Sequence, residues 1–342
     1  MLPRHHKTPT RRAVADLVVE HLTVLLRMNN GDDARVVDDV SFTVAAGRSL
    51  ALVGESGSGK TLTALALLRL LPDVAHISAG SALLRTLDES GPVDVDLLSL
   101  PESALARVRG KRVAMVFQEP MTALNPLLRV DDQAGEALRV HKGLSKKQAR
   151  VAATELLGKM GVPASRACAY PHELSGGQRQ RVMLAMALAA APEVLIADEP
   201  TTALDVTVQA QILSLLQHEQ QTRRLALLLI THDLGVVAEV CDDVVVMYAG
   251  RVVESGSVVD VFAHPRHPYT QALLAAIPSR ALPGKPLPQI PGQVPSVAQW
   301  PTGCRFRDRC PQADEACIGE PPMKILAADV GTGTQLVRCV HV

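Results

Sequence analysis

Eight glycine-rich residues constrain the fold of this chain more than any other segment. An apolar run at residues 49–53 precedes them, and a helix-forming run at 62–71 follows them. Glycines let the backbone fold closely around a triphosphate, so that N–H groups and a helix N-terminus face its oxygens. The segment therefore predicts a strand, a nucleotide-binding phosphate loop and a helix in that order. Its residues are Gly54, Glu55, Ser56, Gly57, Ser58, Gly59, Lys60 and Thr61.

Polar residues that directly follow apolar runs predict the rest of the site. Continuous apolar runs bounded by turns are typical of strands buried on both faces of a mostly parallel sheet. Such sheets bind their ligands beyond the carboxyl ends of the strands. Repeated alternation of strands and helices predicts an α/β fold. The runs and their polar neighbours are 113–117 with Gln118, 194–197 with Asp198 and Glu199, and 225–230 with His232.

The remaining segments predict two further structural regions. Short apolar segments alternate with turn clusters over residues 17–54, which indicates antiparallel strands. Residues 80–109 predict a hairpin and then a short helix. Helical periodicity dominates residues 128–190, where Ser145 is a plausible helix start, and a further helix is expected at 206–221.

Composition and charge exclude several classes of protein. An apolar content of 47% over 342 residues is ample for a large buried core. The 35 basic and 35 acidic residues are interspersed, and only 2% of residues are aromatic, so no nucleic-acid partner is expected. The longest uncharged apolar stretch, residues 182–191, is far shorter than the roughly 20 residues of a membrane-spanning helix. We therefore expect a cytosolic chain that reaches a membrane only through partners.

Five motifs in one order point to a known family. After the phosphate loop come Val116-Phe117-Gln118, Leu174-Ser175-Gly176-Gly177-Gln178, Thr202-Ala203-Leu204-Asp205 and Ile230-Thr231-His232-Asp233. Together they resemble the motifs of the ATP-binding subunit of an ABC transporter. The resemblance implies a P-loop ATPase with a RecA-like core, an antiparallel β subdomain, and a helical subdomain at about residues 120–190.

The resemblance also implies how ATP is hydrolysed. Glu199 would polarise the attacking water as general base, a role worth typically about 10²- to 10⁴-fold in rate. His232 would contact the γ-phosphate, and Gln118 would sense the metal and the water. Mg²⁺ would be held by Thr61, Asp198 and Gln118, while Lys60 would bind the β and γ phosphates.

Two further segments concern contacts of the nucleotide with a second subunit and with the residue beside its base. Ser175, Gly176, Gly177 and Gln178 could simply cap a helix. In the resembled family the same helix end also faces the γ-phosphate held by a second, homologous ATPase subunit, which implies dimerisation for turnover. The family usually stacks adenine on an aromatic residue near the first strand, where this chain has an aliphatic residue, Leu26, so looser base selectivity is expected.

Longer segments narrow the resemblance to one group of transporters. Residues 117–126, 231–237 and 264–274 resemble oligopeptide and dipeptide permease ATPases. The implied function is ATP hydrolysis that powers peptide import at the cytoplasmic face of the cell membrane. The implied partners are a second ATPase subunit, two integral membrane subunits and an extracytoplasmic substrate-binding protein. A nickel or other small-solute importer of the same group is the nearest alternative, and a soluble ABC ATPase outside transport is a more distant one.

Changes in composition predict the domain boundaries. Residues 1–15 are expected to be a flexible tail, and 16–277 the ATPase domain. A proline-rich linker is expected at 278–301, because prolines occupy positions 278, 283, 286, 288, 291, 295 and 301. Residues 302–342 form a predicted cysteine-rich extension.

The extension carries Cys304, Cys310, Cys317 and Cys339, which suggest a metal that holds a small unit together. A reducing cytosol argues against disulfides, and the spacings lack the Cys-x₂-Cys pairs usual for structural zinc. Peptide-permease ATPases of the resembled group include members with a [4Fe-4S] cluster in this tail. A [4Fe-4S] cluster is therefore expected, with zinc, metal-free thiols and disulfides as alternatives. The charge of the cluster could be offset by Arg305, Arg307, Arg309 and Arg338, while the two other cysteines, Cys168 and Cys241, are expected to be small buried residues.

Overall fold

The computed structural model describes residues 15–88, 91–202, 204–277, 288–330 and 333–342. Residues 1–14 of the predicted N-terminal tail, Ala203 of one motif and the first part of the proline-rich linker therefore lie outside the described residues, whereas Ala15, the last residue of that predicted tail, is buried at the start of the first strand. Among the described residues, no helix combines the length and the apolar character needed to cross a membrane.

Two sheets organise the molecule. The smaller sheet is antiparallel, with strand order β2-β1-β4-β5. Its strands are β1 (Ala15–Arg27), β2 (Asp33–Val44), β4 (Ala75–Asp88) and β5 (Gly91–Asp96). This sheet matches the expected antiparallel region. The hairpin and short helix expected at residues 80–109 correspond to β4 with β5 and to α2 (Glu102–Val108).

The larger sheet has eight strands in the order β11-β12-β10-β9-β3-β8-β7-β6. Five of them are parallel and carry the apolar runs seen in the sequence, which are buried on both faces. They are β3 (Ser49–Val53), β6 (Val113–Val116), β7 (Val194–Asp198), β8 (Ala226–Ile230) and β9 (Asp243–Tyr248).

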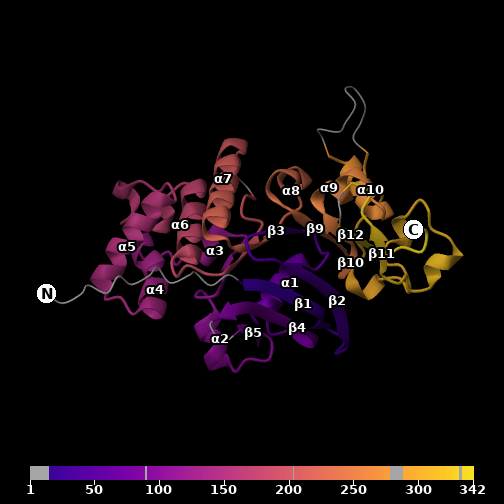
Figure 1. Cartoon of the computed structure of the whole chain (residues 1–342), viewed down its shortest axis with the longest axis horizontal. Helices are drawn as coiled ribbons and strands as arrows, with labels where there is room; N and C mark the ends of the chain where they lie inside the picture. The colour runs from indigo at the N-terminus through magenta and orange to yellow at the C-terminus, as the bar shows by residue number, and fades with distance from the viewer. Residues whose placement is uncertain (1–14, 89–90, 203, 278–287, 331–332) are drawn as a thin grey trace.

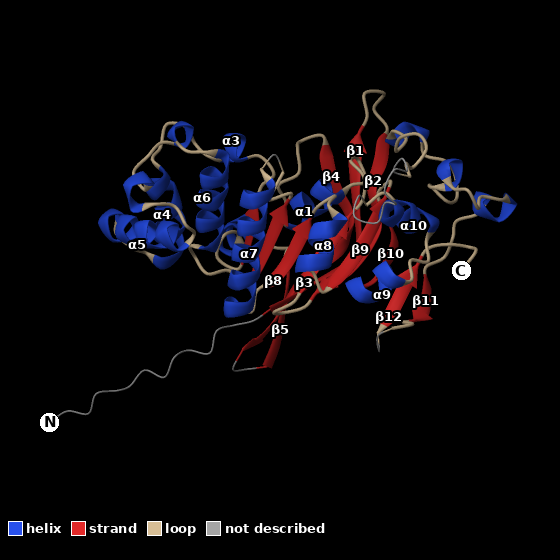
Figure 2. Cartoon of the chain, turned by 90° about the horizontal axis from the view of Figure 1, so that it is seen from above, coloured by secondary structure: helices blue, strands red, loops and turns tan. Residues whose placement is uncertain are grey.

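Helices gather at one end of the molecule, as Figures 1 and 2 show for α4, α5 and α6. These helices are α4 (Val130–Lys142), α5 (Lys146–Lys159) and α6 (Gly176–Leu188), preceded by the short α3 (Pro120–Ala123). Ser145 begins α5 through a reciprocal capping box with Gln148, as the sequence indicated. The other helices are α1 (Lys60–Leu67), α7 (Val206–Arg223), α8 (Leu234–Val240), α9 (Val258–Ala263) and α10 (Pro268–Ala275).

The C-terminal residues lie at the opposite end in both views and extend the larger sheet. Strand β12 (Thr334–Val337) pairs with β10 (Arg251–Ser257), and β11 (Lys324–Ala327) pairs with β12. Phe306 is buried among Tyr248, Tyr269 and His267, with ring centroids 5.1, 5.3 and 5.9 Å away. The cysteine-bearing segment is thus packed onto the edge of the main sheet, an arrangement that the sequence patterns did not predict.

Candidate nucleotide site

The phosphate loop has the backbone that its glycines were expected to allow. Gly54 and Gly59 have φ angles of +150° and +99°, a region that side chains disfavour. A Cβ at Gly54 would lie 2.2 Å from the carbonyl oxygen of Met247, so no other residue fits there. The loop therefore connects β3 to α1 in the predicted order and leaves the N-terminus of α1 open toward a ligand.

Lys60 is folded back over its own loop. Its Nζ donates to the carbonyl oxygens of Gly54 and Glu55 over 2.8 and 2.9 Å. Burial lowers the pKa of Lys60, and the nearby carboxylates of Glu199, Asp198 and Glu55 oppose that effect. Lys60 Nζ also donates to Ser58 Oγ over 3.4 Å, so the buried ammonium is held beside the phosphate-loop backbone, where an anionic ligand would meet it.

Glu199 is the centre of the polar contacts at the strand ends. Its carboxylate accepts hydrogen bonds from Thr202 Oγ1 over 2.8 Å and Gln118 Nε2 over 3.2 Å, and lies 3.2 Å from His232 Nδ1. Burial alone would raise the pKa of Glu199, but bonds from Thr202 and His232 and the charge of Lys60 hold it below its usual range. The carboxylate is therefore ionised at neutral pH and can accept a proton.

The backbone of Glu199 is strained in a way that the sequence did not reveal. Its φ is +44°, in the left-handed region that non-glycine residues rarely adopt, and its N–H donates to the carbonyl of Ile230 over 2.9 Å. Thr202 was also missed as a partner of this carboxylate. Its position three residues after Glu199 is the only sequence signal for that contact.

Asp198 ends β7 beside the loop. Its Oδ1 accepts a hydrogen bond from Thr61 Oγ1 over 3.4 Å. Burial raises the pKa of Asp198, and the bond from Thr61 and the charge of Lys60 oppose the shift. A carboxylate and a hydroxyl that face each other are oxygen donors of the kind that Mg²⁺ prefers.

A cavity of about 410 Å³ runs along the loop. Its lining also includes Gln118 and Glu199. The structure thus brings the predicted loop and the residues at three strand ends together. It does not bring Ser175 and its neighbours into this cavity: they form the N-terminus of α6, where Ser175 and Gln178 cap each other's backbone N–H groups and Ser175 is exposed.

The C-terminal segment contacts the phosphate loop directly. Arg309 donates to both carboxylate oxygens of Glu55, over 2.7 and 3.0 Å, and its guanidinium lies over the ring of Tyr248. The backbone N–H of Glu55 donates to the hydroxyl of Tyr269 over 2.8 Å. Glu55 is therefore held from two sides by residues far from it in the sequence.

The four tail cysteines share one part of this segment. Cys317 and Cys339 are buried, whereas Cys304 and Cys310 are partly buried. Burial is the largest cause that raises the pKa of Cys304 to about 11, and the thiols of Cys317, Cys310 and Cys339 raise it further. The backbone N–H of Cys304 also donates to the carbonyl of Cys317 over 3.0 Å.

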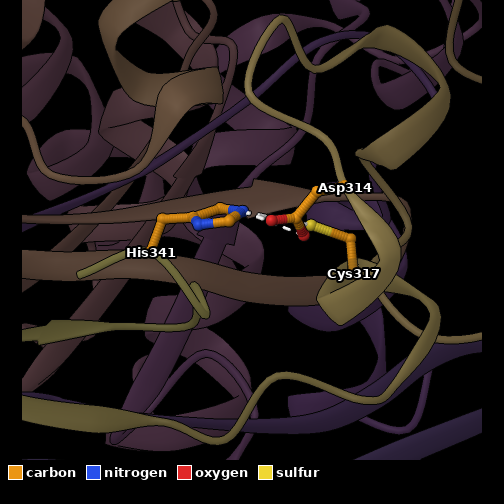
Figure 3. A group of neighbouring side chains, drawn as sticks. All are labelled: Asp314, Cys317 and His341. Atoms are coloured by element: carbon orange, nitrogen blue, oxygen red, sulfur yellow. Dashed lines mark hydrogen bonds and ion pairs between the residues drawn. The ribbon is translucent and has the colours of Figure 1, made fainter.

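A second group of donors includes Cys317. Figure 3 shows Asp314, Cys317 and His341 pointing toward one another, with ligand atoms within 4.8 Å of each other. His341 Nε2 lies 3.6 Å from the sulfur of Cys317 and 3.4 Å from an oxygen of Asp314. Asp314 and His341 were not predicted as site residues, since they are 27 positions apart in the sequence and match no ligand motif.

The expectation that Cys168 is a small buried residue was wrong. The four arginines expected to offset cluster charge each pair with a carboxylate, because an acidic side chain lies within reach of each. Cys168 is exposed rather than buried, with its sulfur 3.5 Å from Asp131, and Cys241 is partly buried. The arginine pairs are Arg305 with Asp38, Arg307 with Asp308, Arg309 with Glu55, and Arg338 with Asp39.

Comparisons with known proteins agree with the fold. The family described as "ABC transporter" matches residues 37–202, and "Oligopeptide/dipeptide transporter, C-terminal region" matches residues 253–317. A putative peptide import ATP-binding protein of Brucella melitensis biotype 1 is 53% identical over 315 residues, which cover 89% of this chain and 91% of the relative. Another from Brucella abortus (strain 2308) is 47% identical over 325 residues and covers 94% of each chain.

Solved structures show the same architecture. The dimeric post-hydrolysis cassette MJ0796, bound to ADP and Pi, has a TM-score of 0.61 and 25% identity, covering 71% of this chain and 98% of that one. The cbiO1 protein of Clostridium perfringens, part of the ABC transporter complex cbiONQ, has a TM-score of 0.57 and 28% identity, covering 72% and 90%. Fold and site thus define an ABC-type ATPase cassette. The chain belongs to the oligopeptide/dipeptide family of ABC-transporter ATP-binding subunits.

Proposed function

We propose that this ATPase powers peptide import through an ABC transporter. The observation that carries the proposal is the match of residues 253–317 to the oligopeptide/dipeptide C-terminal region, and relatives named as peptide import proteins support it. The proposed assembly contains a second homologous ATPase subunit, two integral membrane subunits and an extracytoplasmic substrate-binding protein, with this chain on the cytoplasmic face. A nickel or other small-solute importer is the alternative, because the solute binds other subunits.

At the nucleotide site, Glu199 is proposed to be the general base. Its ionised carboxylate, its bonds to Gln118 and Thr202 and its contact with His232 support that role. His232 would contact the γ-phosphate and fix the attacking water. Thr61, Asp198 and Gln118 would hold Mg²⁺, which supplies charge neutralisation on the phosphates when bound.

The cap of α6 is proposed to complete the site of a second subunit. Ser175 and Gly176 are exposed and lie outside the cavity of their own chain, as a surface that binds across an interface requires. Backbone N–H groups at this helix N-terminus would face the γ-phosphate bound by the partner, together with Gly177 and Gln178.

A [4Fe-4S] cluster is proposed for Cys304, Cys310, Cys317 and Cys339. Four thiols in one part of the segment have the donor type and number that such a cluster takes. When bound, the cluster would cross-link the segment that packs onto the phosphate loop. The triad of Asp314, Cys317 and His341 supports a competing proposal, a single ion such as zinc.

Two measurements test these proposals. In the reconstituted transporter with its binding protein, peptide should stimulate ATP hydrolysis and nickel should not; stimulation by nickel alone would assign the chain to the alternative. Protein purified without oxygen should contain about four irons and four sulfides per chain. If the cluster is present, Cys310→Ser should remove it and His341→Ala should retain it. The opposite pattern, zinc that is lost in His341→Ala and kept in Cys310→Ser, would favour a single ion at Asp314, Cys317 and His341.

A further inference from the structure

The nucleotide cavity has a wall that comes from the far end of the sequence. Besides the phosphate loop, its lining includes residues 294–297 and Trp300. Residues Val297–Gln299 form a short 3₁₀ turn, and Val297 packs against the core that β1 and β2 contribute to. The lining therefore combines polar residues, such as Lys60 and Glu199, with apolar residues, such as Val36 and Val297.

Trp300 is held rigidly in that wall. Its indole Nε1–H donates to the carbonyl oxygen of Pro295 over 2.9 Å. The guanidinium of Arg305 lies 4.2 Å from the ring centroid and is itself paired with Asp38 of β2. A Cβ at Gly250 would lie 2.9 Å from the ring, so the glycine allows this close approach. Arg305 thus covers one face of the ring, and the Trp300 side chain also lines the cavity.

Leu26, the residue expected near the base, does not line this cavity. It pairs with Ala34 and Ala75 on neighbouring strands and packs against the core. Trp300 is therefore the aromatic side chain among the described cavity residues. Nucleobases stack favourably on aromatic rings, with about 1–3 kcal/mol lost per base when the aromatic residue is replaced by alanine.

We propose that Trp300 stacks on the purine base of ATP, so that the C-terminal segment completes the nucleotide site of its own chain. The triphosphate would lie along the phosphate loop, and the base would lie against Trp300. A chain cut before this segment would retain its phosphate contacts and lose its base contact.

The sequence contains a single tryptophan, which makes the proposal directly measurable. In the full-length chain, MgATP should quench the fluorescence of Trp300 to saturation, whereas inorganic tripolyphosphate, which has no base, should bind without that quench. Calorimetric titration of Trp300→Ala should show affinity for MgATP weakened about 5- to 150-fold and affinity for tripolyphosphate unchanged. Trp300→Phe should retain most of the ATP affinity, because it keeps a stacking ring.

Leu26→Ala is the matched control, since it removes an apolar side chain at the position where stacking was expected. It should leave the ratio of ATP to tripolyphosphate affinity unchanged. Equal weakening of ATP and tripolyphosphate in Trp300→Ala would mean that the ring only supports the fold. Tighter ATP binding in that variant would mean that the ring occupies the position of the base, and either result would overturn the proposal.

Discussion

The phosphate loop and the C-terminal segment 288–342 contact each other but are positioned by different means. The loop lies between a buried strand and a helix, and its shape is fixed by backbone conformation at glycines such as Gly54. The C-terminal segment has short strands and 3₁₀ turns, and it is anchored by side chains: Phe306 in an aromatic cluster and Arg309 on Glu55. The shape of the loop is specified by neighbouring residues, whereas the C-terminal segment is held by contacts with residues far away in the sequence.

The largest expected effect lies in the locally encoded region. Glu199→Gln should lower ATP hydrolysis in the assembled transporter by about 10²- to 10⁴-fold, because the amide cannot accept a proton from water. ATP binding should persist, since Lys60 and the loop are unchanged. Lys60→Ala is the contrasting variant and should weaken nucleotide binding itself. Near wild-type hydrolysis by Glu199→Gln would remove this residue from the role of base.

The difference between the two regions explains what the sequence could predict. The loop, the strand ends and the capping box at Ser145 are specified by residues close together in the chain, so patterns were sufficient to predict them. Trp300 and the pairing of β12 with β10 depend on packing between distant segments. Arg309 and Glu55 are separated by 254 positions, and no local pattern records such a contact. The strain at Glu199 likewise follows from tertiary structure.

Phe306 tests whether side-chain anchoring holds the C-terminal segment. Its ring is 1% exposed, so Phe306→Ala should lower the free energy of unfolding by about 3–5 kcal/mol. Ile325→Ala in the same segment is the control, because Ile325 is 71% exposed and should change stability by less than about 0.5 kcal/mol. Urea unfolding measures both. Equal, small changes would mean that the sheet pairing of β12 alone holds the segment.

A double-mutant cycle measures how tightly the two regions are coupled. Arg309→Met and Glu55→Gln should each lower the free energy of unfolding. The double variant should lower it by less than the sum of the two single changes. The expected coupling is on the order of 1–3 kcal/mol, because the pair forms two charge-assisted bonds and Arg309 is only 7% exposed. Strictly additive losses would show that the segment and the loop are energetically independent.

His267, whose ring packs against Phe306, should make the stability of this part of the molecule depend on pH. The side chain is 2% exposed and accepts a hydrogen bond from the backbone N–H of Tyr269 over 3.0 Å. Burial lowers the pKa of His267 to about 3, against about 6.5 in an unfolded chain. Below about pH 6.5 only the unfolded chain takes up this proton, so stability is fully present above that pH and falls as the pH drops toward 3.

Replacing this histidine should therefore reduce the fall in the free energy of unfolding as the pH is lowered. His267→Asn keeps an acceptor for the Tyr269 N–H and cannot titrate. The wild-type chain should lose up to about 1.4 kcal/mol more per pH unit than the variant between pH 6.5 and 4.5, as measured by urea unfolding. The neighbouring Glu254, whose pKa burial raises, acts in the opposite direction but is present in both proteins, so its contribution largely cancels in the comparison. If the free energies of unfolding of the two proteins changed in parallel with pH, His267 would not be buried as a neutral ring in the folded protein. The packing of His267 against Phe306 would then be wrong.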